Sequence, residues 1–189
     1  MAKVQSLLNK GEILTGLIWN EEEKKVVDRY QFLTAKPRLY LLNGRDEEVP
    51  LLIIEAFKKE KWPYLIIDIL TELQAADLTK DERKSLSLPA DSEMDLLIKE
   101  SYELLDLITF FTTLSNEVRA WTLQRGKKAP QAGKEVHTDF AEKFIKADVI
   151  NWQELVNTGS YAVAREKGLI RTEGKDYVVQ DGDIIEVKI

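Results

Sequence analysis

Few residues in this chain could support catalysis, and their spacing excludes several kinds of active site. The sequence contains no cysteine and a single histidine, His137. Thiolate zinc sites, cysteine nucleophiles and multi-histidine metal centres are therefore excluded. Gly-Lys pairs begin at Gly126, Gly133 and Gly174, but none has the earlier glycine that completes a Walker A phosphate loop. The sequence also contains neither a GxGxxG motif nor a nucleophile elbow, so the motif search identifies no catalytic centre.

The composition is that of an ordinary globular protein. The chain has 189 residues, of which 44% are hydrophobic and 32% charged, which fits one domain or two small ones. No apolar run approaches the ~18 residues that a membrane span requires. We therefore expect a cytoplasmic protein that does not enter a membrane.

Charge is distributed unevenly, and one basic stretch stands out. Residues 1–110 contain 15 basic and 21 acidic residues, whereas residues 111–189 contain 12 of each. Within the second part, residues 118–134 include no acidic residue. A local basic stretch in an acidic protein indicates contact with an anionic partner such as RNA; the alternative is a solvated loop. The basic residues of this stretch are Arg119, Arg125, Lys127, Lys128 and Lys134.

The first half of the chain predicts a parallel βαβ piece. Residues 38–43 and 64–69 are short apolar runs consistent with strands, and residues 49–62 between them fit a helix. Because two strands alone are marginal in water, such a piece is expected to need a larger sheet. Further helices are predicted over 2–9, from Asn20 until Pro37 ends it, over 79–87 with Thr79 as cap, and over about 92–107 with Asp91 as cap. Asn20 and Glu23 are expected to form a capping box at the start of the second of these helices.

The second half predicts short strands and turns, and we place a domain boundary near residue 113. Residues 124–133 are polar with two glycines and a proline, which predicts a loop. Residues 151–167 fit a helix that is interrupted at Gly159, and Gly182 is expected to supply a positive φ in a turn. The strands are predicted over 117–123, 144–150, 169–171, 177–179 and 184–189.

Several longer segments follow one another in a fixed order through the second half. They are Leu107-Ile-Thr-Phe-Phe-Thr112, Asn116-Glu-Val-Arg-Ala-Trp-Thr122, Lys128-Ala-Pro-Gln-Ala132, Val136-His-Thr-Asp-Phe140 and Gly174-Lys-Asp-Tyr-Val-Val-Gln-Asp-Gly-Asp183. Together they closely resemble the C-terminal region of the YchF/Obg-like ATPase family. The stretch Leu33-Thr-Ala-Lys-Pro37 resembles the same family upstream. The resemblance covers nearly the whole chain and corresponds to the C-terminal half of the family.

The resemblance implies an α+β fold with two parts. Residues 1–112 would contain the end of a helical insert and the last part of a P-loop nucleotide-binding domain. Residues 113–189 would form a TGS domain, which has a β-grasp, ubiquitin-like fold. Members of the family hydrolyse ATP or GTP with Mg and associate with ribosomes. For this chain alone the resemblance implies no catalysis and no cofactor of its own, because the P-loop has no counterpart here.

The resemblance also implies roles for individual residues. Asn43 and Asp46 fall where such domains carry an Asn-x-x-Asp/Glu motif that reads the nucleotide base, although the family usually has Glu at the last position. The alternative for this pair is a structural turn at the end of a strand. The five basic residues and His137 would contact ribosomal RNA, with Trp121 and Phe140 as stacking candidates. The alternative for His137 is a hydrogen-bonded structural histidine, and the alternative for Trp121 and Phe140 is a place in the core.

Three functions are compatible with these features. The leading hypothesis is a ribosome- or RNA-associated binding module that is not catalytic alone. The second is one half of an ATP- or GTP-hydrolysing translation factor, completed by a separate P-loop half. The third is a protein-interaction adaptor that uses a β-grasp edge strand and the N-terminal helices.

Overall fold

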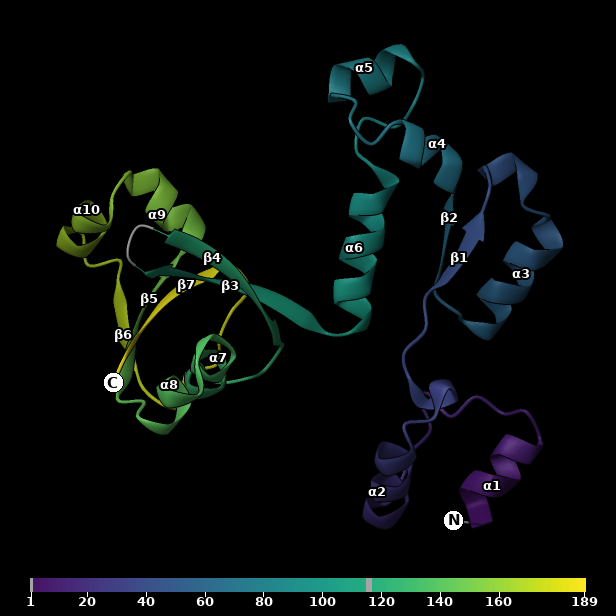
Figure 1. Cartoon of the computed structure of the whole chain (residues 1–189), viewed down its shortest axis with the longest axis horizontal. Helices are drawn as coiled ribbons and strands as arrows, with labels where there is room; N and C mark the ends of the chain where they lie inside the picture. Colours follow the sequence, from purple (N-terminus) through teal and green to yellow (C-terminus); the bar gives the residue numbers. More distant parts are fainter. Residues whose placement is uncertain (1, 115–116) are drawn as a thin grey trace. The chain divides into compact units, whose positions relative to one another are not determined.

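The computed structural model describes residues 2–114 and 117–189, without the side chain of Leu114. It divides the chain into two compact units, of which the first ends at Leu104 and the second spans Leu105–Ile189 (Figure 1). The first unit has a small parallel sheet with helices, and the second has a larger mixed sheet. This arrangement confirms the predicted α+β fold class. Within the described residues, no helix has the length and apolar character needed to cross a membrane.

The chain begins with two helices that enclose a small core of their own. They are α1 (Ala2–Asn9) and α2 (Glu21–Tyr30). The predicted capping box at α2 is confirmed: Asn20 Oδ1 accepts from the Glu23 N–H at 2.8 Å, and Glu23 Oε2 accepts from the Asn20 N–H at 3.1 Å. The buried apolar residues here are Val4, Leu14 and Val27.

Helix α2 ends sooner than its apolar pattern predicts. Gln31 adopts a left-handed conformation with φ 47°, and its N–H caps the helix by donating to the Val27 carbonyl. The following residues form a short 3-10 helix, η1 (Leu33–Ala35), before Pro37. The helix predicted to run from Asn20 until Pro37 ends it therefore stops at Tyr30, more than one turn early, because the chain reverses before the proline.

The predicted βαβ piece is confirmed. Strand β1 (Tyr40–Asn43) and strand β2 (Tyr64–Ile67) pair in parallel, with Tyr40 opposite Tyr64 and Asn43 opposite Ile67. Helix α3 (Leu51–Glu60) connects them, preceded by the 3-10 turn η2 (Asp46–Glu48). Both strands end at the same edge of the sheet, so the loops after Asn43 and Ile67 are neighbours.

Three further helices complete the first unit: α4 (Ile69–Gln74), α5 (Lys80–Ser85) and α6 (Glu93–Leu104). Thr79 caps α5 as predicted, within a full capping box. Helix α4 is not predicted by the sequence pattern, because it follows β2 directly and its apolar residues continue the run of the strand. The predicted helix over 92–107 stops at Leu104.

The second unit is a five-stranded mixed sheet with the β-grasp arrangement. Its strand order is β4-β3-β7-β5-β6, in which β3 and β7 are parallel and every other neighbouring pair is antiparallel. The first and last strands therefore lie side by side in the middle of the sheet (Figure 1). The strands are β3 (Leu107–Leu114), β4 (Glu117–Gln124), β5 (Lys146–Asn151), β6 (Arg171–Glu173) and β7 (Asp183–Lys188).

Each face of this sheet carries its own apolar core. Because side chains alternate along a strand, Ile108 and Phe110 of β3 face one core and Phe111 packs into the other. The first core is closed by α7 (Ala129–Val136), and the second by α9 (Trp152–Thr158) and α10 (Tyr161–Glu166). The short helix α8 (Thr138–Glu142) follows α7.

Several elements of the second unit differ from the sequence prediction. The predicted strand over 177–179 forms only an isolated bridge between Val178 and Lys128. Residues 107–114 form strand β3, so the second unit begins before residue 113, where the sequence suggests the boundary. Helix α7 begins at Ala129, inside the predicted loop. Pro130 lies in the first turn of α7, where proline is favoured because its missing N–H has no helical partner.

Candidate functional site

A cavity of about 420 Å³ lies at the carboxyl ends of β1 and β2. Ligands of open parallel sheets bind at this end of the strands. Asp46, one of the two predicted base-reading residues, lines the cavity. Asn43 lies beside it, and its Oδ1 accepts a hydrogen bond from the Ile69 N–H at 3.2 Å. The amide of Asn43 therefore ties the end of β1 to the start of α4.

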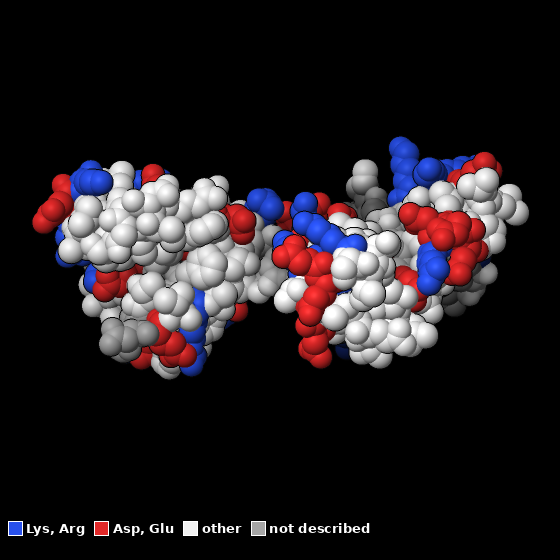
Figure 2. Space-filling model, turned by 90° about the horizontal axis from the view of Figure 1, so that it is seen from above, with Lys and Arg blue, Asp and Glu red and all other residues white. Residues whose placement is uncertain are grey.

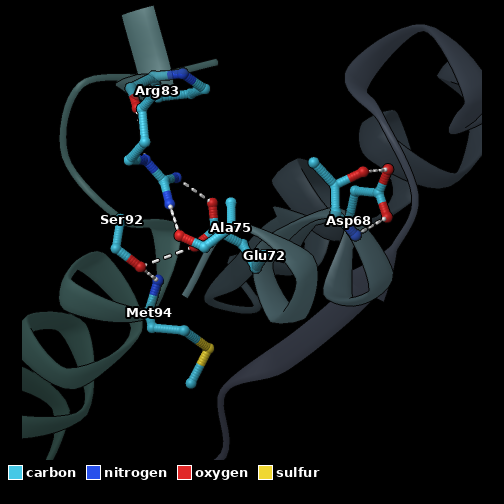
Figure 3. Close-up of polar contacts among 8 residues, drawn as sticks. Asp68, Glu72, Ala75, Arg83, Ser92 and Met94 are labelled. Atoms are coloured by element: carbon cyan, nitrogen blue, oxygen red, sulfur yellow. Dashed lines mark hydrogen bonds and ion pairs between the residues drawn. The ribbon is translucent and has the colours of Figure 1, made fainter. Parts of the chain in front are cut away.

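The loop after β1 is held by its own polar contacts. Gly44 has φ 142°, a conformation that side chains disfavour. The Arg45 N–H donates to Glu48 Oε2 at 3.0 Å, and Arg45 Nε approaches Asp68 Oδ2 at 3.5 Å. Asp68 also accepts from the side chain and the N–H of Thr71, at 2.6 and 3.0 Å (Figure 3). These contacts, led by the Thr71 hydroxyl, lower the pKa of Asp68 below its usual value.

Carboxylates dominate the wall of the cavity, which bears on the ligand it can accept. Asp46, Glu47, Asp68, Glu72 and Glu93 all line it, against a single cation, Arg45, which is itself paired with Asp68. Burial raises the pKa of Glu93, and the neighbouring charges of Glu72, Asp46 and Asp68 raise it further. Such a wall repels phosphate and accepts hydrogen bonds from N–H groups, such as those on the edge of a nucleobase.

A buried ion pair supports this wall from behind. Arg83 and Glu72 are 3% and 5% exposed, and the Arg83 guanidinium donates to Glu72 Oε1. Arg83 also donates to the carbonyls of Pro89 at 2.8 Å and Ala75 at 3.3 Å. Ser92 Oγ donates to Glu72 Oε2 at 2.7 Å (Figure 3). The network fixes the segment 86–93 over the cavity, and sequence analysis missed it because its members are far apart in the chain.

In the second unit, three of the five predicted basic residues are in exposed ion pairs. Arg119 Nε lies 3.0 Å from a Glu117 carboxylate oxygen. Arg125 Nε lies 3.0 Å from Asp106 Oδ1, and Lys128 Nζ lies 2.6 Å from Asp176 Oδ1. Each pair is well exposed to solvent. Exposed pairs contribute ~0–1 kcal/mol, so an incoming phosphate can replace the carboxylate.

The remaining two lysines have a different environment. Lys127 and Lys134 are exposed, and neither has an ion-pair partner among the residues that the structure describes. The loop that carries Lys127 is fixed to the strand-like segment 177–179, because the Val179 N–H donates to the Lys127 carbonyl at 3.0 Å. The backbone that presents these side chains is thus anchored. On the face drawn in Figure 2, basic and acidic side chains lie next to each other on both units.

His137 and the two aromatic candidates have structural contacts. His137 Nδ1 accepts from the Asp139 N–H at 3.2 Å, so the ring caps α8 while remaining exposed. Trp121 packs against the core of the sheet and donates from Nε1 to Thr112 Oγ1 at 2.9 Å. Phe140 lies against Gly133 of α7, where an added Cβ would approach Phe140 Cβ to 3.1 Å. These contacts favour the core alternative for Trp121, whereas Phe140 is half-buried beside Gly133 and His137 and is not a member of the core clusters of the described residues.

A buried carboxylate, Asp183, organises the turn before β7. Asp183 is 1% exposed and accepts from the Tyr177 hydroxyl at 2.7 Å and the Gln180 N–H at 2.9 Å. Burial, and then the hydrogen bond to Asp183, raise the pKa of Tyr177 to about 12. The protonated Tyr177 therefore stabilises the fold fully below pH ~10, and this contribution is lost as the pH rises through about 12.

This linkage predicts the behaviour of Tyr177→Phe. At neutral pH the variant should be less stable by ~1–3 kcal/mol, because buried Asp183 loses a donor. Between about pH 10 and 12 the wild type should lose stability that the variant no longer has, so their difference should shrink. Urea unfolding of both proteins at a series of pH values measures this difference in stability. A difference that stays constant across this range would contradict the assignment.

The second unit matches a known protein family. Residues 107–189 match the family YchF-GTPase_C, described as "Protein of unknown function (DUF933)". With its β-grasp sheet, this part of the chain thus falls in the class of C-terminal domains found in YchF-type nucleotide-binding proteins.

Curated relatives extend the match to the whole chain. The chain is 34% identical over 200 residues to "Ribosome-binding ATPase YchF" of Bacillus subtilis. The alignment covers 100% of this chain and 54% of that protein. The chain is also 34% identical over 205 residues to "Obg-like ATPase 1" of Caenorhabditis elegans, covering 100% and 50%. The chain is therefore related over its full length to the YchF/Obg-like ATPase family, which confirms the resemblance predicted from the sequence. It spans about half the length of these relatives.

A solved structure agrees with this relationship. The chain superposes on the YchF GTPase of Schizosaccharomyces pombe with a TM-score of 0.82 and 29% sequence identity. The match covers 99% of this chain and 53% of that protein. The fold is thus that of the corresponding half of a YchF protein.

Proposed function

We propose that residues 105–189 form a TGS domain that binds ribosomal RNA in the cytoplasm, and that this chain is not catalytic alone. The observation that carries the proposal is the anchored basic segment on a β-grasp unit whose relatives include proteins named ribosome-binding. Lys127 and Lys134 would meet phosphates directly. Arg119, Arg125 and Lys128 would exchange their exposed carboxylate partners for phosphates, while His137 would add a contact from the adjoining turn.

Ribosome co-sedimentation at two salt concentrations tests this proposal. Each phosphate contact releases counterions, so the five proposed contacts predict that affinity falls ~130- to 500-fold between 50 and 200 mM salt. The triple variant Arg125→Glu, Lys127→Glu and Lys128→Glu should abolish binding at low salt. A matched control variant replaces three other exposed lysines of the same unit, Lys143, Lys146 and Lys167, with glutamate. This control should keep most of the ribosome binding. Absence of ribosome binding at low salt, or equal losses in both variants, would reject the proposal.

We infer a second candidate function from the first unit, that of one half of an ATP- or GTP-hydrolysing domain. Parallel sheets are normally covered on both faces and extend beyond two strands. Here the flanking helices leave large apolar side chains open to solvent, with Leu51 and Leu52 of α3 exposed by 75% and 77%, and Leu70 and Leu73 of α4 by 64% and 72%. A P-loop half with more parallel strands would cover these residues, and Asn43 and Asp46 would then contact the nucleotide base.

Mixing with a P-loop half tests the second candidate. The N-terminal half of the Bacillus subtilis relative, with Mg and ATP or GTP, should form a complex with this chain on size exclusion and gain hydrolysis. Leu52→Glu with Leu73→Glu should abolish the complex, whereas Glu60→Lys, away from the Leu51–Leu52 face of the same helix α3, should leave it intact. Failure to form a complex at micromolar concentrations would reject this candidate. Capture of a protein partner that survives ribonuclease would favour the adaptor alternative instead.

A further inference from the structure

A second cavity of the first unit, of about 650 Å³, lies at the amino ends of β1 and β2. It is thus at the opposite end of the small sheet from the carboxylate-lined cavity. Its volume is in the range of small-molecule sites. Four segments line it: the loop after α1, the approach to β1, the end of α3 and the last residue of α6.

An aromatic wall forms one side of this cavity. Tyr40 and Trp62 both line it, and their rings stack at 5.5 Å with an interplanar angle of 26°. Phe57 holds both rings edge-on, at 5.0 Å from Tyr40 and 5.5 Å from Trp62. The wall is therefore braced, and both rings are partly exposed.

Charged side chains of both signs complete the lining. Arg38 lies over the Tyr40 ring at 5.6 Å, and Lys61 lines the cavity next to Trp62. Within the described part of the chain, neither cation forms an ion pair. Glu12 and Glu60 also line the cavity, and each is exposed. The cavity thus combines flat aromatic surface with anion-binding and N–H-accepting groups.

Lys61 has a conformation that a side chain disfavours. It ends α3 in the left-handed region with φ 54°, where glycine is the usual residue. A lysine at this position places an ammonium group beside the aromatic wall at some conformational cost. That cost makes Lys61 a useful site for a test, because Lys61→Gly removes the charge and relieves the backbone.

We propose that this cavity binds a purine nucleoside monophosphate unit, either free or within single-stranded RNA. The base would stack on the partly exposed ring of Trp62, because the Tyr40 ring is already stacked on Trp62 and covered by Arg38. The phosphate would meet Arg38 and Lys61, and Glu12 or Glu60 would accept from N–H groups of the base. This site is separate from the basic segment of the second unit and from the cavity that contains Asp46.

Calorimetric titration with AMP, adenosine, ribose 5-phosphate and a short single-stranded RNA tests the proposal. AMP should bind more tightly than adenosine or ribose 5-phosphate. Lys61→Gly should weaken the binding of AMP about tenfold, as expected for the loss of one charged contact, and should leave the affinity for adenosine unchanged. Trp62→Leu should weaken both AMP and adenosine by ~5- to 150-fold, the range for loss of base stacking. RNA titrations use the Arg125→Glu, Lys127→Glu, Lys128→Glu background, so that the basic segment of the second unit does not contribute. RNA binding there that is at least tenfold tighter than AMP, and is weakened by Trp62→Leu, would identify a strand as the source, whereas equal affinities would identify a free nucleotide.

Two control variants test whether the ligand occupies this cavity. Gln31→Gly replaces another left-handed helix-capping residue, with φ 47°, outside the cavity lining, and should leave binding unchanged. Asp46→Arg alters the cavity at the other end of the sheet and should also leave it unchanged. The proposal is overturned if neither AMP nor RNA binds at millimolar concentration. It is equally overturned if Lys61→Gly and Trp62→Leu bind like the wild type, or if Asp46→Arg alone abolishes binding.

Discussion

Replacing Arg83 with methionine should lower the free energy of unfolding of the first unit by ~3–5 kcal/mol, because it leaves a buried carboxylate without its cation. Arg83 and Glu72 have side chains that are each 4% exposed, and the guanidinium also satisfies two backbone carbonyls. Hydrogen exchange of amides in residues 69–104 would measure the loss locally. A double variant, Glu72→Leu with Arg83→Met, should recover much of the stability, because buried ion pairs are often replaceable by apolar residues.

An exposed ion pair of Lys80, which lies on the same helix α5 as Arg83, provides the control. Lys80 Nζ lies 2.5 Å from Asp91 Oδ1, with side chains 72% and 74% exposed. Lys80→Met should cost less than ~1 kcal/mol, since exposed pairs contribute little. If Arg83→Met and Lys80→Met reduced the stability equally, burial would not be the reason for the importance of Arg83.

The pH dependence of the Arg83 variant follows from the neighbouring carboxylate. Burial by itself raises the pKa of Glu72, but hydrogen bonds from Ser92 and Arg83 reverse this and lower the pKa overall. A lowered pKa means that Glu72 stabilises the fold above the unfolded-state pKa of ~4.5, and that this contribution is lost as the pH falls. The stability difference between wild type and Arg83→Met should therefore narrow below about pH 4.5.

Gly182→Ala should reduce the stability of the second unit by ~2–5 kcal/mol, through strain and steric conflict together. Gly182 has φ 82°, which confirms the positive φ predicted for this turn. An added Cβ would approach Cδ1 of Trp152 to 2.6 Å and Nε1 to 2.9 Å. The ring of Trp152, the first residue of α9, would have to move to accommodate it. Chemical denaturation monitored by near-UV circular dichroism would detect both the loss and the displaced ring.

A substitution at Gly126 measures the backbone strain without the steric conflict. It has the same φ of 82°, but an added Cβ there would meet no atom within 4 Å. Gly126→Ala should therefore cost only the ~1–2 kcal/mol of left-handed strain. Similar losses in the two variants would mean that Trp152 yields without cost and that the close contact is unimportant.

Local sequence signals predicted the features of this fold that depend on neighbouring residues. The capping box at Asn20 and the cap at Thr79 are confirmed because a cap and its N3 partner lie within one helical turn. The interruption at Gly159 is confirmed for a similar reason, since glycine alone adopts its left-handed conformation without strain. The family resemblance added the β-grasp sheet, whose parallel middle strands β3 and β7 are far apart in sequence.

Element boundaries were less predictable where two patterns overlap. The apolar residues around Leu105 and Ile108 fit a helix as well as a strand, so the change from α6 to β3 was placed too late. Pairing with β4 and β7 decides this segment, because the strand gains partners on both sides. Helix α4 was missed since its apolar side chains continue the run that ends β2.

The sequence by itself determined the types of side chain available to this protein: no thiol, one imidazole, and a basic segment without acids. Only the tertiary structure decided which of these charges are already paired. Lys128 meets Asp176 and Arg125 meets Asp106 because strand pairing and turns bring distant residues together. Tertiary packing likewise brings Glu72 to Arg83 and stacks the rings of Tyr40 and Trp62. The physical reason is that caps and turns are set by a few consecutive residues, whereas burial and ion pairing depend on the packing of whole elements.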